Sequence, residues 1–499
     1  MKQSKMLILF MLPLLLILIG WGPRPSNEYE DNGFSFNLPT AYRLIETDLS
    51  DNLLVFSSPY STLKVYTEKL KSTVSYQTYI EYGNYQLYLG KADFKVLANT
   101  TSNHNGYLIK QISYYRPTIE NISDDQNYYL ETHIINKKNN TVITFWATAP
   151  QVFYNNIKVD IEVAMQSFLE KQEVAKIPLL APPVASSPHI KYQGRQVTLD
   201  IPSGKLLWGR FFPGVPFSEN SYTNMLENEA KLNHKFEFIM TYSSFGNNLP
   251  FPERDIRKIY QDGRVLMLTL QPFTQDLNWI AVPEFIAGKH DTEIREWAKG
   301  LKKIGEPVFL RPLNEMNGDW DPWCAWFYGK DTDLYVLAWR HIVDIFREVK
   351  ADNVLFVWNP HDRSYPDFTW NNPHLYYPGD EYVDWIGLTG YNNGTSHTAD
   401  VWREFDEIYQ PIYNDYLNRY PDKPFMITEF SCNETGGDKA QWIKAAMTSL
   451  AHKYPNIKIA NWFDAKDKSW LYQLDSSPEA FEAFRGGLLY ENFLKNSVQ

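Results

Sequence analysis

The alternation of apolar and polar residues changes along the chain. Residues 28 to about 175 open with residues 33–39, Gly-Phe-Ser-Phe-Asn-Leu-Pro, which alternate as a half-buried strand does. Further strand-like runs and a closing helical pattern follow at 53–57, 107–115, 128–135, 141–147 and 155–171. This pattern predicts a small α+β domain over residues 25–176, built on an antiparallel sheet.

From about residue 200 onward, short apolar runs are separated by longer helical or loop segments. The runs are 206–212, 236–242, 265–270, 307–311, 354–358, 384–390, 424–429 and 457–462. Helical patterns lie between them, including 292–304, 332–349, 402–418 and 439–452. Nearly continuous Val, Ile, Leu and Phe is typical of strands buried on both faces. Eight such units predict an α/β fold, a (β/α)8 TIM barrel over residues 196–499. A doubly wound open sheet is the alternative, but no glycine-rich phosphate loop follows any run.

The two regions are joined by residues 177–195, of which 177–190 are rich in Pro, Ser and Ala. Such a composition predicts a semi-rigid linker. We therefore expect the N-terminal domain to fold as a separate unit with few contacts to the rest. It carries no paired carboxylates, which favours an accessory or spacer role.

The first 24 residues have the pattern of an export segment. Two lysines lie within residues 1–5, and residues 6–21 are apolar apart from Gly20. The apolar run is shorter than the ~20 residues of an ordinary spanning helix. We expect residues 1–24 to be a signal peptide or an N-terminal membrane anchor, and the protein to be secreted or tethered at the cell surface.

Charge and cysteine content narrow the classes of function. A net charge of −11 argues against nucleic acid as a partner, because phosphate binding needs a basic surface. Cys324 and Cys432 are too few for a disulfide scaffold and lack zinc-ligand spacing, so we expect no metal and no cofactor. A disulfide between them and two free thiols both remain open. The 16 Trp and 33 Tyr suit either stacking on sugar rings or a large core, so their positions must decide.

Two glutamates stand where buried strands end. Glu315 follows the fourth run and Glu429 ends the seventh. In a (β/α)8 barrel, catalytic groups sit at the C-terminal ends of strands. A lone strand-end glutamate is usually a surface charge. Two of them on strands across the barrel mouth can instead form the carboxyl pair of a retaining glycosidase, roughly 5–5.5 Å apart.

Residues 311–318, Arg-Pro-Leu-Asn-Glu-Met-Asn-Gly, followed by Trp320 and Trp323, resemble glycoside hydrolase family 26. Residues 377–387 resemble the sixth-strand motif of the same family. The resemblance covers roughly residues 200–495. The family contains β-mannanases, some mixed-linkage β-glucanases and some xylanases. The N-terminal region only faintly resembles the PsbP-like fold in its opening strand.

The resemblance implies a role for each site residue. Glu315 would be the acid/base and Glu429 the nucleophile of a retaining mechanism, with Tyr391 contacting the nucleophile. Trp462 would be the platform under the sugar being cleaved, and Trp320 an aromatic wall. Further residues considered as sugar contacts are Asn314, Trp323 and Gln271, with Trp326, Trp358 and Trp470 as weaker candidates. Arg311 is expected to be a structural charge beneath Glu429.

One departure bears on the substrate. Mannanases of the family often carry His immediately before the acid/base, whereas this chain has Asn314. In the wider clan this asparagine binds the sugar 2-hydroxyl. We expect a monomeric, endo-acting hydrolase of a β-1,4-linked polysaccharide, with β-mannan first and mixed-linkage β-glucan or xylan as alternatives. A non-catalytic glycan-binding protein is the hypothesis from another class.

Overall fold

The computed structural model describes residues 25–31, 33–48, 52–90, 93–171, 189–190, 201–202, 206–244, 250–273 and 281–497. The predicted export segment (1–24) and most of the predicted linker (177–195) lie outside the described residues. None of the helices in the described ranges is both long enough and apolar enough to cross a membrane.

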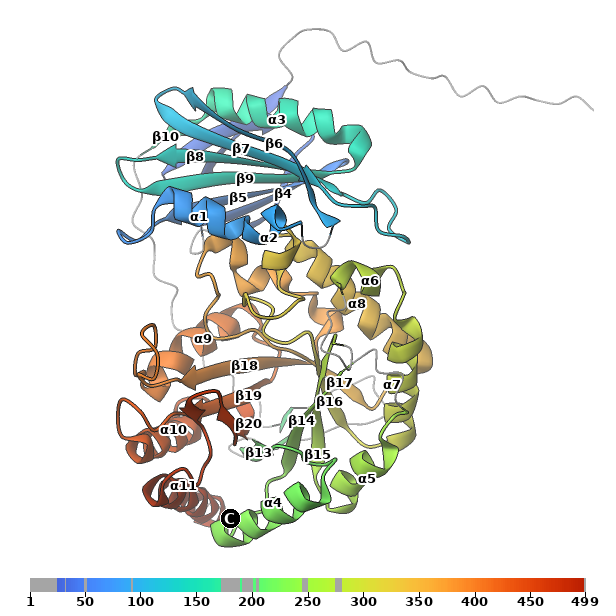
Figure 1. Cartoon of the computed structure of the whole chain (residues 1–499), viewed down its shortest axis with the longest axis vertical. Coiled ribbons are helices and arrows are strands. Elements are labelled where there is room, and N and C mark those ends of the chain that lie inside the picture. Colours follow the sequence, from blue (N-terminus) through green and yellow to red (C-terminus); the bar gives the residue numbers. More distant parts are fainter. Residues whose placement is uncertain are drawn as a thin grey trace, which may run out of the picture.

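The N-terminal domain is built on a seven-stranded antiparallel sheet with the strand order β3-β4-β5-β9-β8-β7-β6. Its strands are β3 (Arg43–Asp48), β4 (Leu53–Ser58), β5 (Ser61–Lys69), β6 (Lys95–His104), β7 (Tyr107–Tyr115), β8 (Tyr128–Asn136) and β9 (Thr141–Ala149). A small second sheet contains β1 (Ser26–Asp31), β2 (Phe34–Pro39) and β10 (Leu169–Glu170). The helices are α1 (Tyr76–Gly83), α2 (Tyr85–Tyr88), η2 (Gln151–Phe153) and α3 (Tyr154–Ser167). Helix α3 covers the outer face of the sheet, and α1 and α2 lie on the side that faces the second domain (Figure 1).

The second domain is a closed barrel of parallel strands, which confirms the predicted (β/α)8 architecture. Its strands are β13 (Leu207–Phe211), β14 (Phe238–Ser244), β15 (Val265–Gln271), β16 (Val308–Pro312), β17 (Val354–Trp358), β18 (Trp385–Asn392), β19 (Phe425–Cys432) and β20 (Ile457–Phe463). Pairing of β13 with β20 closes the ring and excludes the open sheet.

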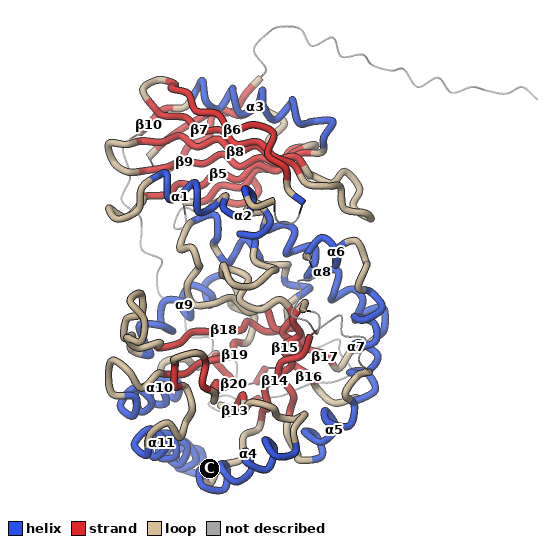
Figure 2. Tube along the Cα trace, viewed as in Figure 1, coloured by secondary structure: helices blue, strands red, loops and turns tan. Residues whose placement is uncertain are grey.

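Helices surround the strands as an outer layer (Figure 2). They are α4 (Glu219–Leu232), α5 (Glu253–Gln261), α6 (Val282–Ile286), α7 (Asp291–Ile304), α8 (Thr332–Val349), α9 (Phe405–Arg419), α10 (Lys439–His452) and α11 (Pro478–Ser497). Short elements in the loops are η3 (Ala325–Tyr328), η4 (Thr369–Asn371), η5 (Pro373–Tyr376), η6 (Asp380–Tyr382), β21 (Lys466–Asp467) and β22 (Trp470–Leu471). Two isolated short strands, β11 (His189–Ile190) and β12 (Ile201–Pro202), pair with each other.

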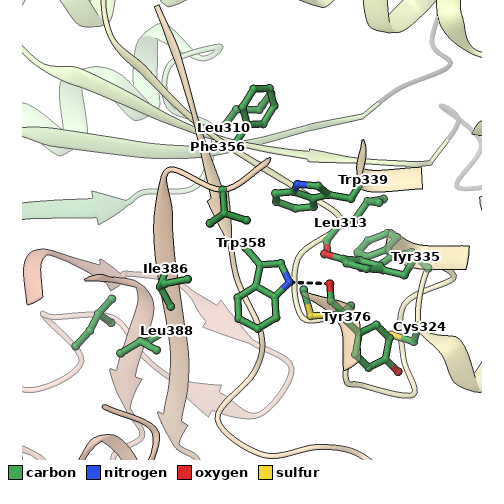
Figure 3. Close-up of a cluster of buried hydrophobic side chains, with 14 of the residues drawn as sticks. Leu310, Leu313, Cys324, Tyr335, Trp339, Phe356, Trp358, Tyr376, Ile386 and Leu388 are labelled. Atoms are coloured by element: carbon green, nitrogen blue, oxygen red, sulfur yellow. Dashed lines mark hydrogen bonds between the residues drawn. The ribbon is translucent and has the colours of Figure 1, made fainter. Parts of the chain in front are cut away.

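The barrel strands bury both faces, as their apolar runs predicted. One set of side chains fills the interior of the barrel, including Phe238, Phe309 and Trp385. The other set packs outward against the helices and loops. Figure 3 shows this outer layer around Trp358, whose indole N–H donates to the Tyr376 carbonyl at 3.2 Å. The side chains on both faces of the strands are therefore used in packing, and functional residues are expected at the strand ends.

The expectation of few contacts between the two domains is wrong. The central strands of the N-terminal sheet also bury both faces. In β9, Phe145 packs in the core under α3, whereas Trp146 belongs to a hydrophobic cluster that continues into the barrel domain. The linker composition predicted a loose connection, but the sheet itself makes the contact through its second apolar face.

Candidate active site

Glu429 lies in β19, buried and held by three donors. The Arg311 guanidinium forms an ion pair with its Oε1, and the Tyr242 hydroxyl donates to the same oxygen at 2.5 Å. The Tyr391 hydroxyl donates to Oε2. The carboxylate is therefore fixed in orientation and its negative charge is compensated, as a positioned nucleophile requires.

Arg311 is itself fixed from below. Its guanidinium donates to Thr269 Oγ1 at 2.7 Å and to Asn359 Oδ1 at 2.7 Å, and its side chain is fully buried. These contacts place it beneath Glu429 as a structural charge, where the sequence analysis expected it. Tyr391 likewise lies where the resemblance put it. Tyr242 was missed, although it ends the second predicted run and so satisfies the strand-end criterion.

Glu315 lies in the loop that follows β16. Its backbone N–H donates to the Asn359 carbonyl at 2.7 Å, and its carbonyl accepts from Gly318 N–H at 3.0 Å. Both Leu313 and Glu315 have positive φ, 48° and 55°, which is unfavourable for residues with large side chains. Such strain persists only where the surroundings enforce it, and it concentrates at functional sites.

The environment of Glu315 suits a general acid. Burial raises the pKa of this carboxyl to about 7, and the negative charges of Glu429 and Asp321 act in the same direction. The nearby His361 and Arg311 oppose the rise. The resulting pKa lets Glu315 carry a proton near neutral pH and release it during reaction. Asn359 joins the two glutamates in one site, because its carbonyl accepts from the Glu315 backbone N–H and its side-chain oxygen accepts from Arg311, which pairs with Glu429.

Asn314 and Gln271 meet beside the acid/base. The Gln271 amide donates to Asn314 Oδ1 at 3.3 Å, so the ends of β15 and β16 are joined at this point. Trp320 is 42% exposed, and its ring contacts the rings of His361 and Tyr365 at centroid distances of 5.3 and 5.4 Å. An exposed indole beside the acid/base remains a candidate sugar contact.

Two of the predicted aromatic contacts are wrong. Trp323 is fully buried and donates to the Asn314 carbonyl at 2.6 Å, so it supports the loop from below. Trp462 is also fully buried, with Phe430 and Phe484 around it and its N–H donating to the Tyr472 carbonyl. Neither ring has a free face on which a sugar could stack.

Phe463, one residue beyond Trp462, faces the other way. Its ring stacks on Phe211 at 4.7 Å and contacts the Tyr391 ring at 5.8 Å. It is only partly buried. Successive side chains alternate across a strand, so a prediction one residue out of register selects the wrong face. Phe463 is the better candidate for the aromatic platform.

The weaker tryptophan candidates separate by exposure. Trp358 is buried in the outer layer of the barrel, and Trp326 lies under the N-terminal domain. Trp470 is partly exposed and donates to Asp400 at 2.9 Å.

Cys324 and Cys432 are both buried and free. Within the described ranges, no cluster of three or more His, Cys, Asp or Glu side chains could hold a metal ion.

Comparison with known proteins places these residues in a family. Residues 285–429 match the sequence profile of "Glycosyl hydrolase family 26", a span that includes both glutamates. Endoglucanase H of Acetivibrio thermocellus is 34% identical over 277 residues, which cover 54% of this chain and 29% of that protein. The mannan endo-1,4-β-mannosidase of Bacillus subtilis is 29% identical over 181 residues, 35% of this chain and 43% of that protein. The chain thus spans less than half the length of these relatives.

Solved structures of the family also match, at lower identity. The Bacillus subtilis mannanase is 19% identical over 54% of this chain and 81% of that chain, with a TM-score of 0.39. The β-mannanase of Bacteroides ovatus is 16% identical over 58% of this chain and 88% of that chain, with a TM-score of 0.42. The faint PsbP-like resemblance of the N-terminal region is not borne out. Residues 285–429 thus match glycosyl hydrolase family 26, and a longer stretch of the chain is similar in sequence to Endoglucanase H.

Proposed function

We propose that this protein is a retaining, endo-acting β-glycanase that hydrolyses a β-1,4-linked polysaccharide by double displacement. One observation carries the proposal. Glu429 is oriented by Arg311, Tyr242 and Tyr391, while burial raises the pKa of the neighbouring Glu315 to about 7. Two carboxyl groups in one site, one charge-compensated and one protonated near neutral pH, are what a retaining glycosidase needs.

The two steps follow from this division. In the first, Glu429 attacks the anomeric carbon while Glu315 donates its proton to the departing glycosidic oxygen. Glu315 is then ionised. In the second step it takes a proton from water, which attacks the same carbon and releases Glu429. Two inversions leave the product with the β configuration of the substrate.

The substrate is proposed as β-mannan, with mixed-linkage β-glucan as the second candidate. Four of the curated relatives are named mannan endo-1,4-β-mannosidases, which supports the first. Asn314, in the position where family mannanases often carry His, and the 34% identity to an endoglucanase support the second. In either case the Asn314 amide is suited to the sugar 2-hydroxyl.

Release of reducing ends from mannan, glucomannan, lichenan and xylan tests both the activity and the substrate. The matched control is Glu429→Gln, which keeps the size of the side chain and removes the nucleophile. We expect the wild type to act on mannan or lichenan at least about tenfold faster than on xylan. Binding to a glycan without release of reducing ends would establish the non-catalytic alternative instead.

We further propose that residues 1–24 direct export, so that the protein acts outside the cell or at its surface. The support is the charged and apolar pattern of that segment. Fractionation of expressing cells, with N-terminal sequencing of the mature chain, distinguishes a cleaved signal from a retained anchor. Recovery of the intact chain in the cytosol would refute export.

A further inference from the structure

The loop that carries Glu315 is in contact with the N-terminal domain at its far end. This catalytic loop, residues 313–331, runs from β16 to the start of α8. The Gly329 carbonyl accepts from the Tyr114 hydroxyl at 2.8 Å and from the Trp146 indole at 3.2 Å. Lys330 forms a buried ion pair with Glu131 at 2.7 Å. The N-terminal sheet therefore fixes the end of the loop nearest α8.

A second contact lies much nearer the acid/base. Tyr82, on helix α1 of the N-terminal domain, donates its hydroxyl to Asp319 Oδ2. Its ring stacks on Trp326 with centroids 5.2 Å apart and an interplanar angle of 20°. The Trp326 indole in turn donates to the Tyr82 carbonyl at 2.7 Å. Ring and backbone of Tyr82 are thus fixed, which directs the hydroxyl at Asp319.

Asp319 stands between two parts of the active site. On one side the turn from Glu315 to Gly318 is closed by a 3.0 Å backbone hydrogen bond. On the other side is Trp320, whose ring packs so closely on Gly318 that a Cβ there would lie 2.7 Å from it. A displacement of Asp319 is therefore passed to both the Glu315 turn and the Trp320 indole.

We propose that Tyr82 is a positioning residue of the active site, which acts through Asp319 to hold Glu315 and Trp320 in the geometry for proton donation. The N-terminal domain then completes the catalytic site and is more than a spacer. The inference rests on the proposed function. The contribution of helix α1 can be tested by removing a single oxygen atom, because Tyr82→Phe deletes the hydroxyl that donates to Asp319 and keeps the stacking on Trp326.

Tyr82→Phe should lower kcat/KM on the polysaccharide by about tenfold, since small misplacements of catalytic groups are costly. An aryl β-glycoside with a good leaving group needs no proton to depart, so its kcat/KM should change less than about twofold. The matched control is Tyr85→Phe. Tyr85 also stacks on Trp326, at 6.1 Å, but among the described residues its hydroxyl makes no hydrogen bond. This variant should behave as wild type on both substrates.

Substitutions at Asp319, which accepts the Tyr82 hydrogen bond, provide a second test. Asp319→Asn keeps an oxygen that accepts from Tyr82 and should retain activity within about threefold, whereas Asp319→Ala should match Tyr82→Phe. Combining Tyr82→Phe with Asp319→Ala should add little, because both remove one interaction. An additive loss would overturn the proposed coupling. So would equal losses of Tyr82→Phe on both substrates, which indicate a general structural role.

Hydrogen exchange provides a readout that does not depend on activity. Amides of residues 315–320 should exchange faster in Tyr82→Phe than in wild type, and at the wild-type rate in Tyr85→Phe. Unchanged exchange in Tyr82→Phe would overturn the inference. If the wild type cleaves no glycan, the proposed function fails, while the exchange experiment still decides whether Tyr82 holds the loop.

Discussion

At the scale of single residues, the protonation of Glu315 governs the pH dependence. Its pKa is raised to about 7, mainly by burial. The acid must be protonated for the first step, so kcat/KM should fall about tenfold per pH unit as the pH rises above about 7. A profile of kcat/KM against pH on a polysaccharide checks this. An alkaline limb that begins above pH 9 would show that another group is the acid.

The alanine variants of the two glutamates should lose activity in different ways. Glu429→Ala should lose nearly all activity on every substrate, because the glycosyl-enzyme cannot form. Glu315→Ala should still be glycosylated by an aryl glycoside with a good leaving group, and added azide should restore turnover by attacking the intermediate. Proton NMR of fresh wild-type hydrolysate should show β product first. Initial release of α product would indicate an inverting enzyme and remove Glu429 as nucleophile.

Asn314 should contribute mainly in the transition state. Asn314→Ala should reduce kcat by about tenfold or more while raising KM by less, because the 2-hydroxyl contact strengthens as the reaction proceeds. Gln271→Ala is the companion variant, since its amide donates to Asn314 Oδ1 and its loss shows how far that hydrogen bond positions Asn314. Steady-state kinetics on one glycan suffices. An unchanged kcat for Asn314→Ala would place its amide away from the sugar.

The sequence predicted the two glutamates because they stand where apolar runs end. A strand end can be located without knowing which face of the strand each side chain occupies. It misassigned Trp462 because β20 is buried on both faces, so hydrophobicity does not show which of two adjacent aromatics faces the barrel mouth. Trp462 and Phe463 differ only in the direction that the closed barrel gives them. Tyr242 could have been predicted, because it ends an apolar run. His361 lies in the loop after β17, and no sequence pattern indicated its place near Glu315.

At the scale of elements, strands in the barrel follow the predicted runs closely. The fifth run, 354–358, coincides with β17, and the second, 236–242, begins two residues before β14. The strands could be predicted because continuous β-branched and aromatic residues suit two-sided burial. The contact made by α1 could not be predicted. That helix is short and polar in part, and its partners lie more than 200 residues away.

Arg311 connects several of these strands. From β16 it contacts Thr269 in β15, Asn359 after β17 and Glu429 in β19. Arg311→Met should lower the free energy of unfolding by about 3–5 kcal/mol, because it leaves a buried carboxylate uncompensated. Adding Glu429→Gln should recover part of that loss. Chemical denaturation of the three variants tests this, and no recovery in the double variant would show that the ion pair is not the source.

At the scale of the whole molecule, the two domains share one hydrophobic cluster and a set of buried polar contacts. The Lys330–Glu131 pair is buried on both sides, and burial lowers the pKa of the Lys330 ammonium, which Glu131 opposes. The Tyr129 hydroxyl donates to Asp331 at 2.7 Å. The composition of the linker gave no indication of this interface, because a Pro-rich sequence indicates the stiffness of the linker and not whether the domains on either side pack together.

A chain of residues 196–499 should therefore be far less stable than the full protein. Removing the N-terminal domain exposes the Trp326 ring, on which Tyr82 and Tyr85 stack, and leaves Lys330 without its carboxylate. We expect poor solubility or a melting temperature lower by about 5 °C or more. As a milder test in the full chain, Lys330→Met should destabilise by about 3–5 kcal/mol, because it removes the ammonium that faces the buried Glu131 carboxylate. Glu131→Gln added to it should recover part of that loss, because it removes the buried charge and keeps polar atoms for His133, Asn84 and Tyr114. A truncated chain as soluble, stable and active as the whole would show that the interface holds nothing the catalytic domain needs.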